Sequence, residues 1–191
     1  MKISTKRQHA VRLTVTGAVA LVILSSSGCT AEQSRNEPRQ RISVSQVNRY
    51  TDLDQMQRDS SAVVVAHAVD STTGTNDRIP ITKTSAKIRK VLAGSVPESS
   101  INVQQLGTDR VDSPDTSRLM KSGETYLLYL SKDSGKENGE DFVITGGDGI
   151  YVLQGHRYVY RGGPPTGPGK SLPAELPADE TEKKVTSQQQ Q

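Results

Sequence analysis

The sequence predicts a mainly β fold, a small antiparallel barrel or sandwich of about six or seven strands with one short helix in front of them. Two observations carry this prediction. Seven segments rich in β-branched and aromatic residues, six of them short, follow one another between residues 62 and 161. Clusters of Gly, Pro, Ser, Asn and Asp separate most of them, and short strands spaced in this way are typical of small barrels and sandwiches.

The helix is expected at residues 51–59. Thr51 can cap it and Asp54 can reach back to the cap, a variant of the capping box, while Leu53 and Met56 share one side. Residues 62–69 (AVVVAHAV) form a β-branched run typical of a buried strand. Residues 71–76 (STTGTN) have the composition of a loop.

Five of the six remaining segments are short. Residues 79–92 alternate apolar and basic side chains and predict the one long strand, and residues 101–106 (INVQQL) predict the next. A long polar loop covers residues 107–122. Residues 126–130 (YLLYL) are the most hydrophobic segment and are expected at the centre of the sheet. Strands at residues 142–145 and 150–153 flank residues 146–149 (GGDG), which predict a hairpin turn with positive φ, and the last strand covers residues 157–161.

The first 28 residues have the layout of an export signal. Four basic side chains precede an apolar run over residues 13–24. This run is shorter than the roughly 20 apolar residues that span a bilayer, so a permanent transmembrane helix is the poorer alternative. Small residues (SSSG, 25–28) lead into Cys29, the only cysteine of the chain.

This junction resembles the lipobox of bacterial lipoproteins. The resemblance implies cleavage between Gly28 and Cys29, a diacylglyceryl thioether on Cys29, and attachment of the protein to the extracytoplasmic face of a membrane. Members of the family usually carry Leu three residues before the cysteine, where this chain has Ser26. The alternative is an ordinary secretory peptide followed by an unpaired thiol.

Removal of the leader changes the charge of the protein. The chain has 24 basic and 21 acidic residues, and residues 1–28 hold four basic and no acidic ones, which leaves a formal charge of −1. We therefore expect no nucleic-acid partner. Residues 29–41 are expected to be the lipidated cysteine and a flexible tether, residues 42–161 the β domain, and residues 162–191 a disordered tail.

The order of segments also resembles the OB-like barrels of metalloproteinase-inhibitor and netrin modules. The resemblance covers most of residues 50–161 and rests on segments such as VVVA (63–66), GETYLLYL (123–130) and GGDGIYVLQG (146–155). It implies an OB-like fold. The inhibitory activity is not carried over, because those inhibitors need disulfides and a free N-terminal cysteine that chelates the target's metal.

Few residues are candidates for chemistry. The mature chain has two histidines, His67 in a strand and His156 in a turn, without the spacing of a zinc site. Either could join a serine and an aspartate in a hydrolase, although no G-x-S-x-G segment presents a nucleophile. Three further groups have a functional and a structural interpretation. A Ca²⁺ site or plain loop charges would explain Asp109, Asp112 and Asp115. An oligonucleotide or anionic-lipid site, or the polar face of a strand, would explain Lys83, Lys87, Arg89 and Lys90. A ligand groove or barrel packing would explain Tyr126, Tyr129, Tyr151, Tyr158 and Tyr160.

We therefore expect a lipid-anchored, monomeric and non-enzymatic protein of the cell envelope, without a cofactor, that binds an undefined protein partner. Cys29 is the one residue with an assigned role, which is attachment to the membrane. An envelope hydrolase using His67 or His156 and an inhibitor of extracellular proteases remain alternatives. The sequence leaves open whether the loop at residues 107–122 binds anything.

Overall fold

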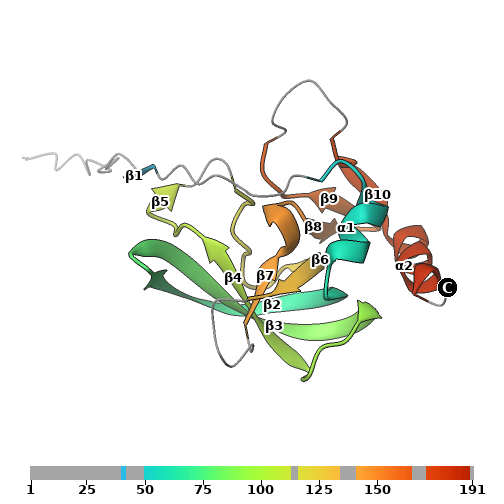
Figure 1. Cartoon of the computed structure of the whole chain (residues 1–191), viewed down its shortest axis with the longest axis horizontal. Helices are drawn as coiled ribbons and strands as arrows, with labels where there is room; N and C mark the ends of the chain where they lie inside the picture. The colour runs from blue at the N-terminus through green and yellow to red at the C-terminus, as the bar shows by residue number, and fades with distance from the viewer. Residues whose placement is uncertain (1–39, 42–49, 113–115, 134–140, 165–170, 190–191) are drawn as a thin grey trace, which may run out of the picture. The chain divides into compact units, whose positions relative to one another are not determined.

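The computed structural model describes residues 40–41, 50–112, 116–133, 141–164 and 171–189. Within them the chain is mainly β, with ten strands, two α-helices and one 3-10 turn (Figure 1). The predicted fold class is thus confirmed at this level. The strands are more numerous than predicted, and there is a second helix that the sequence analysis did not expect.

The elements follow one another along the chain with few long connections. In order they are β1 (Gln40–Arg41), α1 (Leu53–Asp59), β2 (Ala62–Asn76), β3 (Ile79–Gly94), β4 (Ser100–Leu106), β5 (Val111–Asp112), β6 (Thr125–Lys132), β7 (Asp141–Ile144), the turn η1 (Thr145–Gly147), β8 (Ile150–Gln154), β9 (Arg157–Tyr160), β10 (Glu175–Pro177) and α2 (Ala178–Gln188).

Eight strands form one sheet in the order β10-β9-β8-β6-β2-β3-β4-β7, and β6 also pairs with β7. The pairings therefore join β2, β3, β4, β7 and β6 in a closed ring of five. The β4–β7 pair is parallel, so the sheet is mixed and the expectation of a purely antiparallel sheet is wrong. β1 pairs with β5 in a separate parallel ladder, although residues 40–41 were expected to belong to a flexible tether.

The hairpin of β2 and β3 is longer than predicted. Residues 71–76, expected to be a loop, pair with β3 from Ser71–Thr84 to Asn76–Ile79. The turn lies at Asp77 and Arg78, whose φ angles of 47° and 70° suit a tight two-residue hairpin. Composition misled here because three of these polar residues are threonines, and β-branched side chains fit a strand well.

The glycine run at residues 146–149 is a turn, but the strands on either side of it do not pair with each other. β6 pairs with β8 at Tyr126–Leu128 and with β7 at Leu130–Lys132, so η1 carries the chain along one edge of β6. Gly146 and Gly147 have the expected positive φ, 59° and 69°. A Cβ at Gly149 would lie 2.6 Å from Tyr129 Cβ, so this position has no room for a side chain.

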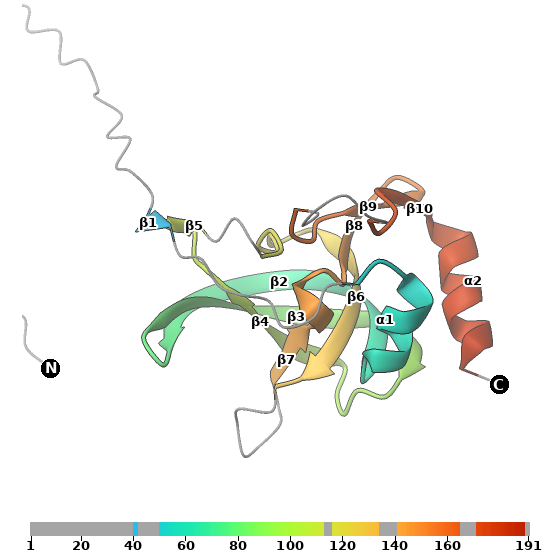
Figure 2. The ribbon, with the colours of Figure 1, turned by 45° about the horizontal axis from the view of Figure 1, so that its top comes forward.

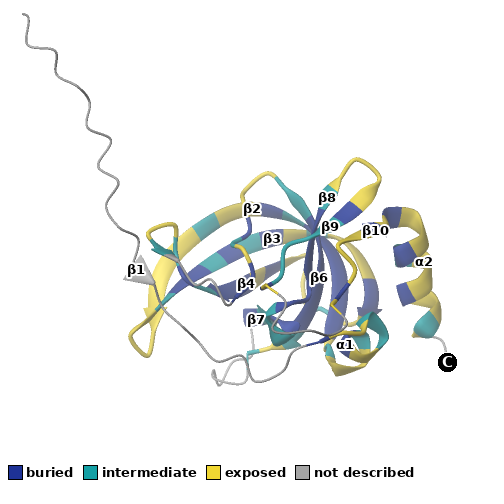
Figure 3. Ribbon diagram, turned by 90° about the horizontal axis from the view of Figure 1, so that it is seen from above, coloured by how far each residue is buried: buried dark blue, intermediate teal, exposed yellow. Residues whose placement is uncertain are grey.

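The core has two parts because β6 and the first part of β2, up to Ala68, are buried on both faces (Figure 3). Successive residues of a strand point to opposite faces, and those of β6 divide between two clusters: Tyr126, Leu128 and Leu130 in the first, Leu127 and Tyr129 in the second. Residues 126–130 therefore read as a continuous apolar run, and β6 lies inside the sheet as predicted.

The C-terminal segment is folded where it is described, so the prediction of a disordered tail is wrong for residues 171–189. β10 pairs with β9, and α2 follows directly. Leu172, Leu176, Ala178 and Val185 are buried in the second cluster. These few apolar residues are enough because they complete a core that the rest of the domain already forms.

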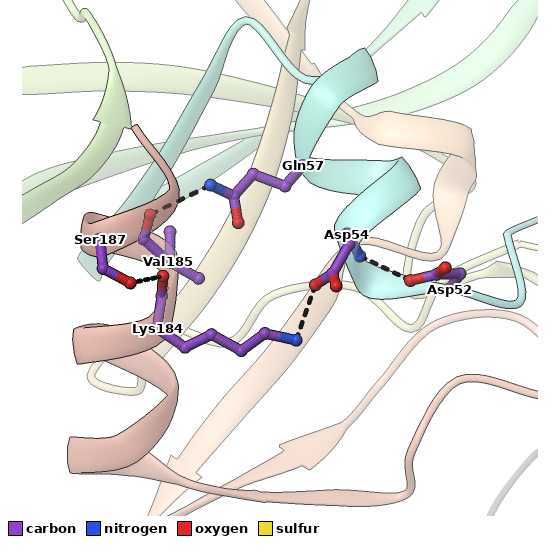
Figure 4. A network of polar contacts seen from close by, with 6 residues as sticks. All are labelled: Asp52, Asp54, Gln57, Lys184, Val185 and Ser187. Carbon is purple, nitrogen blue, oxygen red and sulfur yellow. Dashed lines mark hydrogen bonds and ion pairs between the residues drawn. The ribbon is translucent and has the colours of Figure 1, made fainter. Parts of the chain in front are cut away.

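The two helices are joined by polar contacts (Figure 4). Lys184 Nζ lies 2.7 Å from Asp54 Oδ1, and Gln57 Nε2 donates to the carbonyl oxygen of Val185 at 3.1 Å. Asp52, and not Thr51, caps α1 by accepting from the amide of Asp54 at 2.8 Å. Neither helix in the described ranges is long and apolar enough to cross a membrane.

Candidate functional site

The described residues enclose an open groove of about 1330 Å³ beside the β2–β3 hairpin. Figures 1 and 2 show this hairpin reaching past the other strands, with β5 near its projecting end. We call this cavity the groove. Its lining comprises Ser71, Thr73, Thr82, Leu106, Gly107, Thr108, Asp109, Arg110, Val111, Thr116, Ser117, Arg118, Leu119, Met120, Lys121, Tyr160, Arg161, Gly162, Gly163 and Pro164.

The hairpin supplies a wall of hydroxyl groups. Ser71 and Thr84 are opposite each other, and their hydroxyl oxygens lie 2.9 Å apart. Thr73 and Thr82 form the next pair, and the Thr82 hydroxyl donates to the carbonyl oxygen of Gly107 at 2.8 Å. The end of β4 is thereby attached to the hairpin, which fixes this wall.

The second wall is the segment 116–121, which the side chain of Gln105 holds in place. Gln105 Nε2 donates to Ser117 Oγ and to the carbonyl oxygen of Arg118, both at 3.0 Å. Gln105 Oε1 accepts from the amide of Met120 at 2.9 Å. Met120 is buried in the first core cluster, so one glutamine and one methionine anchor the whole segment to the sheet.

The third wall follows β9. The amide of Arg118 donates to the carbonyl oxygen of Arg161 at 2.9 Å, which joins the second and third walls. The Tyr160 hydroxyl lies 3.0 Å from Asp148 Oδ1 and 3.2 Å from the carbonyl oxygen of Gly163. A Cβ at Gly162 would lie 2.1 Å from that hydroxyl, so a side chain at this position would displace the Tyr160 ring.

Positive charge predominates around the groove. Its lining holds four basic residues, Arg110, Arg118, Lys121 and Arg161, and one acidic residue, Asp109. In the part of the chain that the structure describes, none of these four basic side chains takes part in a hydrogen bond or an ion pair. The groove therefore offers free cationic groups and hydroxyl donors, a combination suited to anionic groups of a ligand.

The histidines lie on different elements, away from each other in the sequence and without a shared partner. His67 on β2 is half-buried, and its Nδ1 lies 3.2 Å from Thr125 Oγ1. His156 is exposed in the turn between β8 and β9. Neither lines the groove, and the described residues contain no group of three or more His, Cys, Asp or Glu side chains that could hold a metal ion.

Of the three aspartates predicted in the long loop, the structure describes only Asp109 in full. Asp109 is exposed and lines the groove. The side chain of Asp112 and all of Asp115 lie outside the described residues, as do the leader and Cys29. Nothing in the structure therefore bears on the lipidation of Cys29.

The basic row on β3 is partly neutralised. Lys83 forms an ion pair with Asp141 at 2.6 Å, and Lys90 forms one with Glu182 at 2.7 Å. Lys87 and Arg89 stay exposed. Since the paired residues come from β7 and α2, this row serves at least in part to attach neighbouring elements.

The tyrosines are mainly part of the core. Tyr126, Tyr129, Tyr151 and Tyr158 are buried, and burial raises the pKa of each hydroxyl well above its ordinary value. Only Tyr160 of the five lines the groove, and its ring packs edge-on against Tyr151 with centroids 5.3 Å apart. The aromatic residues thus support the site more than they form it.

Sequence reasoning did not single out the four basic residues of the groove. Three of them lie in the polar loop at residues 107–122 and the fourth directly follows β9. Loop composition is polar in most proteins, so these side chains carried no signal by themselves. Their gathering depends on the contact between Arg118 and Arg161, which are 43 positions apart.

No protein-family model matches the chain, and no curated protein matches it.

Proposed function

We propose that this protein is a lipid-anchored, non-enzymatic binding module of the cell envelope, and that the groove is its binding site for an anionic partner. The leader, the small residues before Cys29 and the polar segment after it support the anchor. They place the β domain on the extracytoplasmic side, held by lipid on Cys29.

The observation that carries the binding role is the charge of the groove. Within the described residues, four basic side chains without ion pairs surround a cavity that also offers the hydroxyls of Ser71 and Thr73. Some basic residues elsewhere, such as Lys83, Lys90 and Lys184, are paired with acids from other elements. Lys87 and Arg89 are exposed on β3 and do not line the groove. Unpaired cations around one cavity are expected where an external anion supplies the missing charge.

We also propose that the ring of five strands is an OB-like barrel. The ring order β2-β3-β4-β7-β6 with one parallel pair, β4–β7, supports this proposal. Five-stranded barrels of this kind present ligand sites through a strand face and the neighbouring loops, and here the groove lies between a hairpin face and the loop after β4.

The anchor is tested by fractionation of cells that express the chain. We expect the protein in the membrane fraction, with a mature N-terminus at a modified Cys29 in mass spectrometry. Cys29→Ser should abolish the modification, whereas Ser26→Leu, which restores the usual lipobox residue, should retain it. An unmodified Cys29 in the unaltered protein would refute the anchor.

The groove is tested with two kinds of anionic probe, an acidic peptide and polygalacturonate, titrated into the purified full chain. The variant Arg118→Glu/Lys121→Glu should lose binding of whichever probe binds. The control Lys87→Glu/Arg89→Glu changes the net charge equally but lies outside the groove, and it should bind normally. Equal loss in both variants would show that only net charge matters and would overturn the proposed site.

A further inference from the structure

One edge of β2 is free next to the groove. β2 pairs with β3 along its whole length, but on its other side it pairs with β6 only from Ala62 to His67. The last backbone hydrogen bonds on that side involve Ala68. Its carbonyl oxygen accepts from the amide of Gly123 at 2.8 Å, and its amide donates to the carbonyl oxygen of Glu124 at 2.9 Å. From Val69 to Asn76 this edge has no strand partner among the described residues.

A register shift between Ala68 and Asp70 marks the point where the edge becomes free. Such irregularities bend a strand, and Figure 2 shows the hairpin continuing beyond β6. Ser71 and Thr73 on this stretch line the groove. The groove therefore runs beside an exposed row of backbone amides and carbonyls.

Proteins usually protect such edges with lysine, proline or a covering element, because a free edge accepts strands from other chains. Residues 71–76 (STTGTN) contain neither lysine nor proline. Val69, at the start of the edge, is 54% exposed. Asp70 carries the one charge on this stretch. From residue 71 onward three threonines suit a strand, and no lysine or proline opposes pairing.

The charge across the groove selects what can pair there. Counting only the residues that the structure describes, Arg110, Arg118, Lys121 and Arg161 line the groove with four positive charges that have no ion-pair partner, against the single carboxylate of Asp109. Leu106 and Leu119, both partly buried, add apolar surface to the lining. An occupant should therefore have an extended backbone, acidic side chains and some apolar ones.

We propose that the groove binds an extended acidic peptide segment of a partner protein, which adds as a strand to the edge of β2 between Val69 and Asn76. This inference rests on the proposed binding function and names its ligand class. Backbone hydrogen bonds to β2 provide affinity without sequence selectivity, and the cations select acidic side chains on alternate positions of the added strand. The edge is long enough for about seven residues of peptide, roughly 25 Å.

The test uses an amidated peptide of about eight residues that alternates Thr and Glu, a length matched to this edge. It is titrated into the purified full chain in a neutral detergent. Two further peptides carry N-methyl groups on alternate amides, one on the Thr residues and one on the Glu residues. A strand that pairs on one side only uses every second amide.

We expect the unmodified peptide to bind. One of the two methylated peptides should lose binding, and the other should retain it. Hydrogen exchange at residues 71–76 should slow when the peptide is bound. Arg118→Glu and Lys121→Glu should each weaken binding about two- to tenfold at low salt, and Lys87→Glu/Arg89→Glu should not.

Three results would count against the inference. Equal binding of both methylated peptides would exclude strand addition. Binding of polygalacturonate but not of the peptide, with the same dependence on Arg118 and Lys121, would overturn the peptide ligand and leave the proposed function intact. Failure of both probes to bind would refute the proposed function and the inference together.

Discussion

Replacement of Gln105 by leucine tests how the groove is built. The side chain of Gln105 is 4% exposed and forms three hydrogen bonds to the segment 116–121. Leucine has a similar size, so packing is largely retained, but the carbonyl oxygen of Arg118 and the amide of Met120 lose their partners. Buried polar groups without partners are costly, about 1–3 kcal/mol each.

Two such groups, partly relieved by local movement, predict a loss of about 2–4 kcal/mol in the free energy of unfolding for Gln105→Leu. In urea denaturation this corresponds to a fall in the midpoint on the order of 1–2 M. Hydrogen exchange should show that the amide of Met120 loses its protection before the strands do.

The neighbouring glutamine provides a matched control. Gln104 is 8% exposed, and its Oε1 has no hydrogen-bond partner among the described residues. Gln104→Leu should therefore leave the free energy of unfolding unchanged or raise it slightly, because an unsatisfied polar atom is removed. If Gln105→Leu cost no more than Gln104→Leu, the claim that Gln105 anchors the second wall would be wrong.

Three further predictions concern the rest of the domain. Val185→Ala, a change at a side chain only 3% exposed, should lower the free energy of unfolding by about 1–3 kcal/mol; no effect in thermal unfolding would restore the view that the tail is disordered. Acid should loosen α2. The hydrogen bond from Lys184 lowers the pKa of Asp54, and hydrogen bonds from Lys90 and Tyr158 lower that of Glu182 despite its burial. Both carboxyl groups have a lower pKa in the folded state than in the unfolded state, so this stabilisation is complete above about pH 4.5 and is lost as the pH falls. Hydrogen exchange of α2 should become faster in acid, and the variant Asp54→Asn/Glu182→Gln should suppress this pH dependence. Alkali should ionise few tyrosines before unfolding, because five of the six hydroxyls have a raised pKa, mainly from burial; full ionisation near pH 10 in an ultraviolet titration of the folded protein would contradict the burial of these rings.

Local patterns were reliable where a segment buries both faces. Residues 62–66 and 126–130 are continuous apolar runs, and both are buried inside the sheet as expected, whereas His67 is half-buried and Val69 is exposed. The apolar pattern did not predict the strand at residues 71–76, where polar residues continue β2. That stretch is held by pairing with β3 and not by burial.

Polar segments near the end of the chain were misjudged for a related reason. The segment 171–189 has too few apolar residues to fold alone, and composition by itself indicates disorder. Leu176, Ala178 and Val185 nevertheless become buried because the second core cluster already exists for them to join. Sequence windows cannot show a surface that distant elements provide.

The sequence by itself determined the mainly β class, the short helix before the strands, the central position of residues 126–130 and the expectation of an anchor at Cys29. These depend on patterns within a few residues of one another. Only the tertiary structure decided the parallel β4–β7 pair, the docking of α2 and the groove with its free β2 edge. Each of these joins residues far apart in the chain, such as Arg118 with Arg161 and Gln57 with Val185, and such contacts follow from the pairing of whole strands and not from local preference.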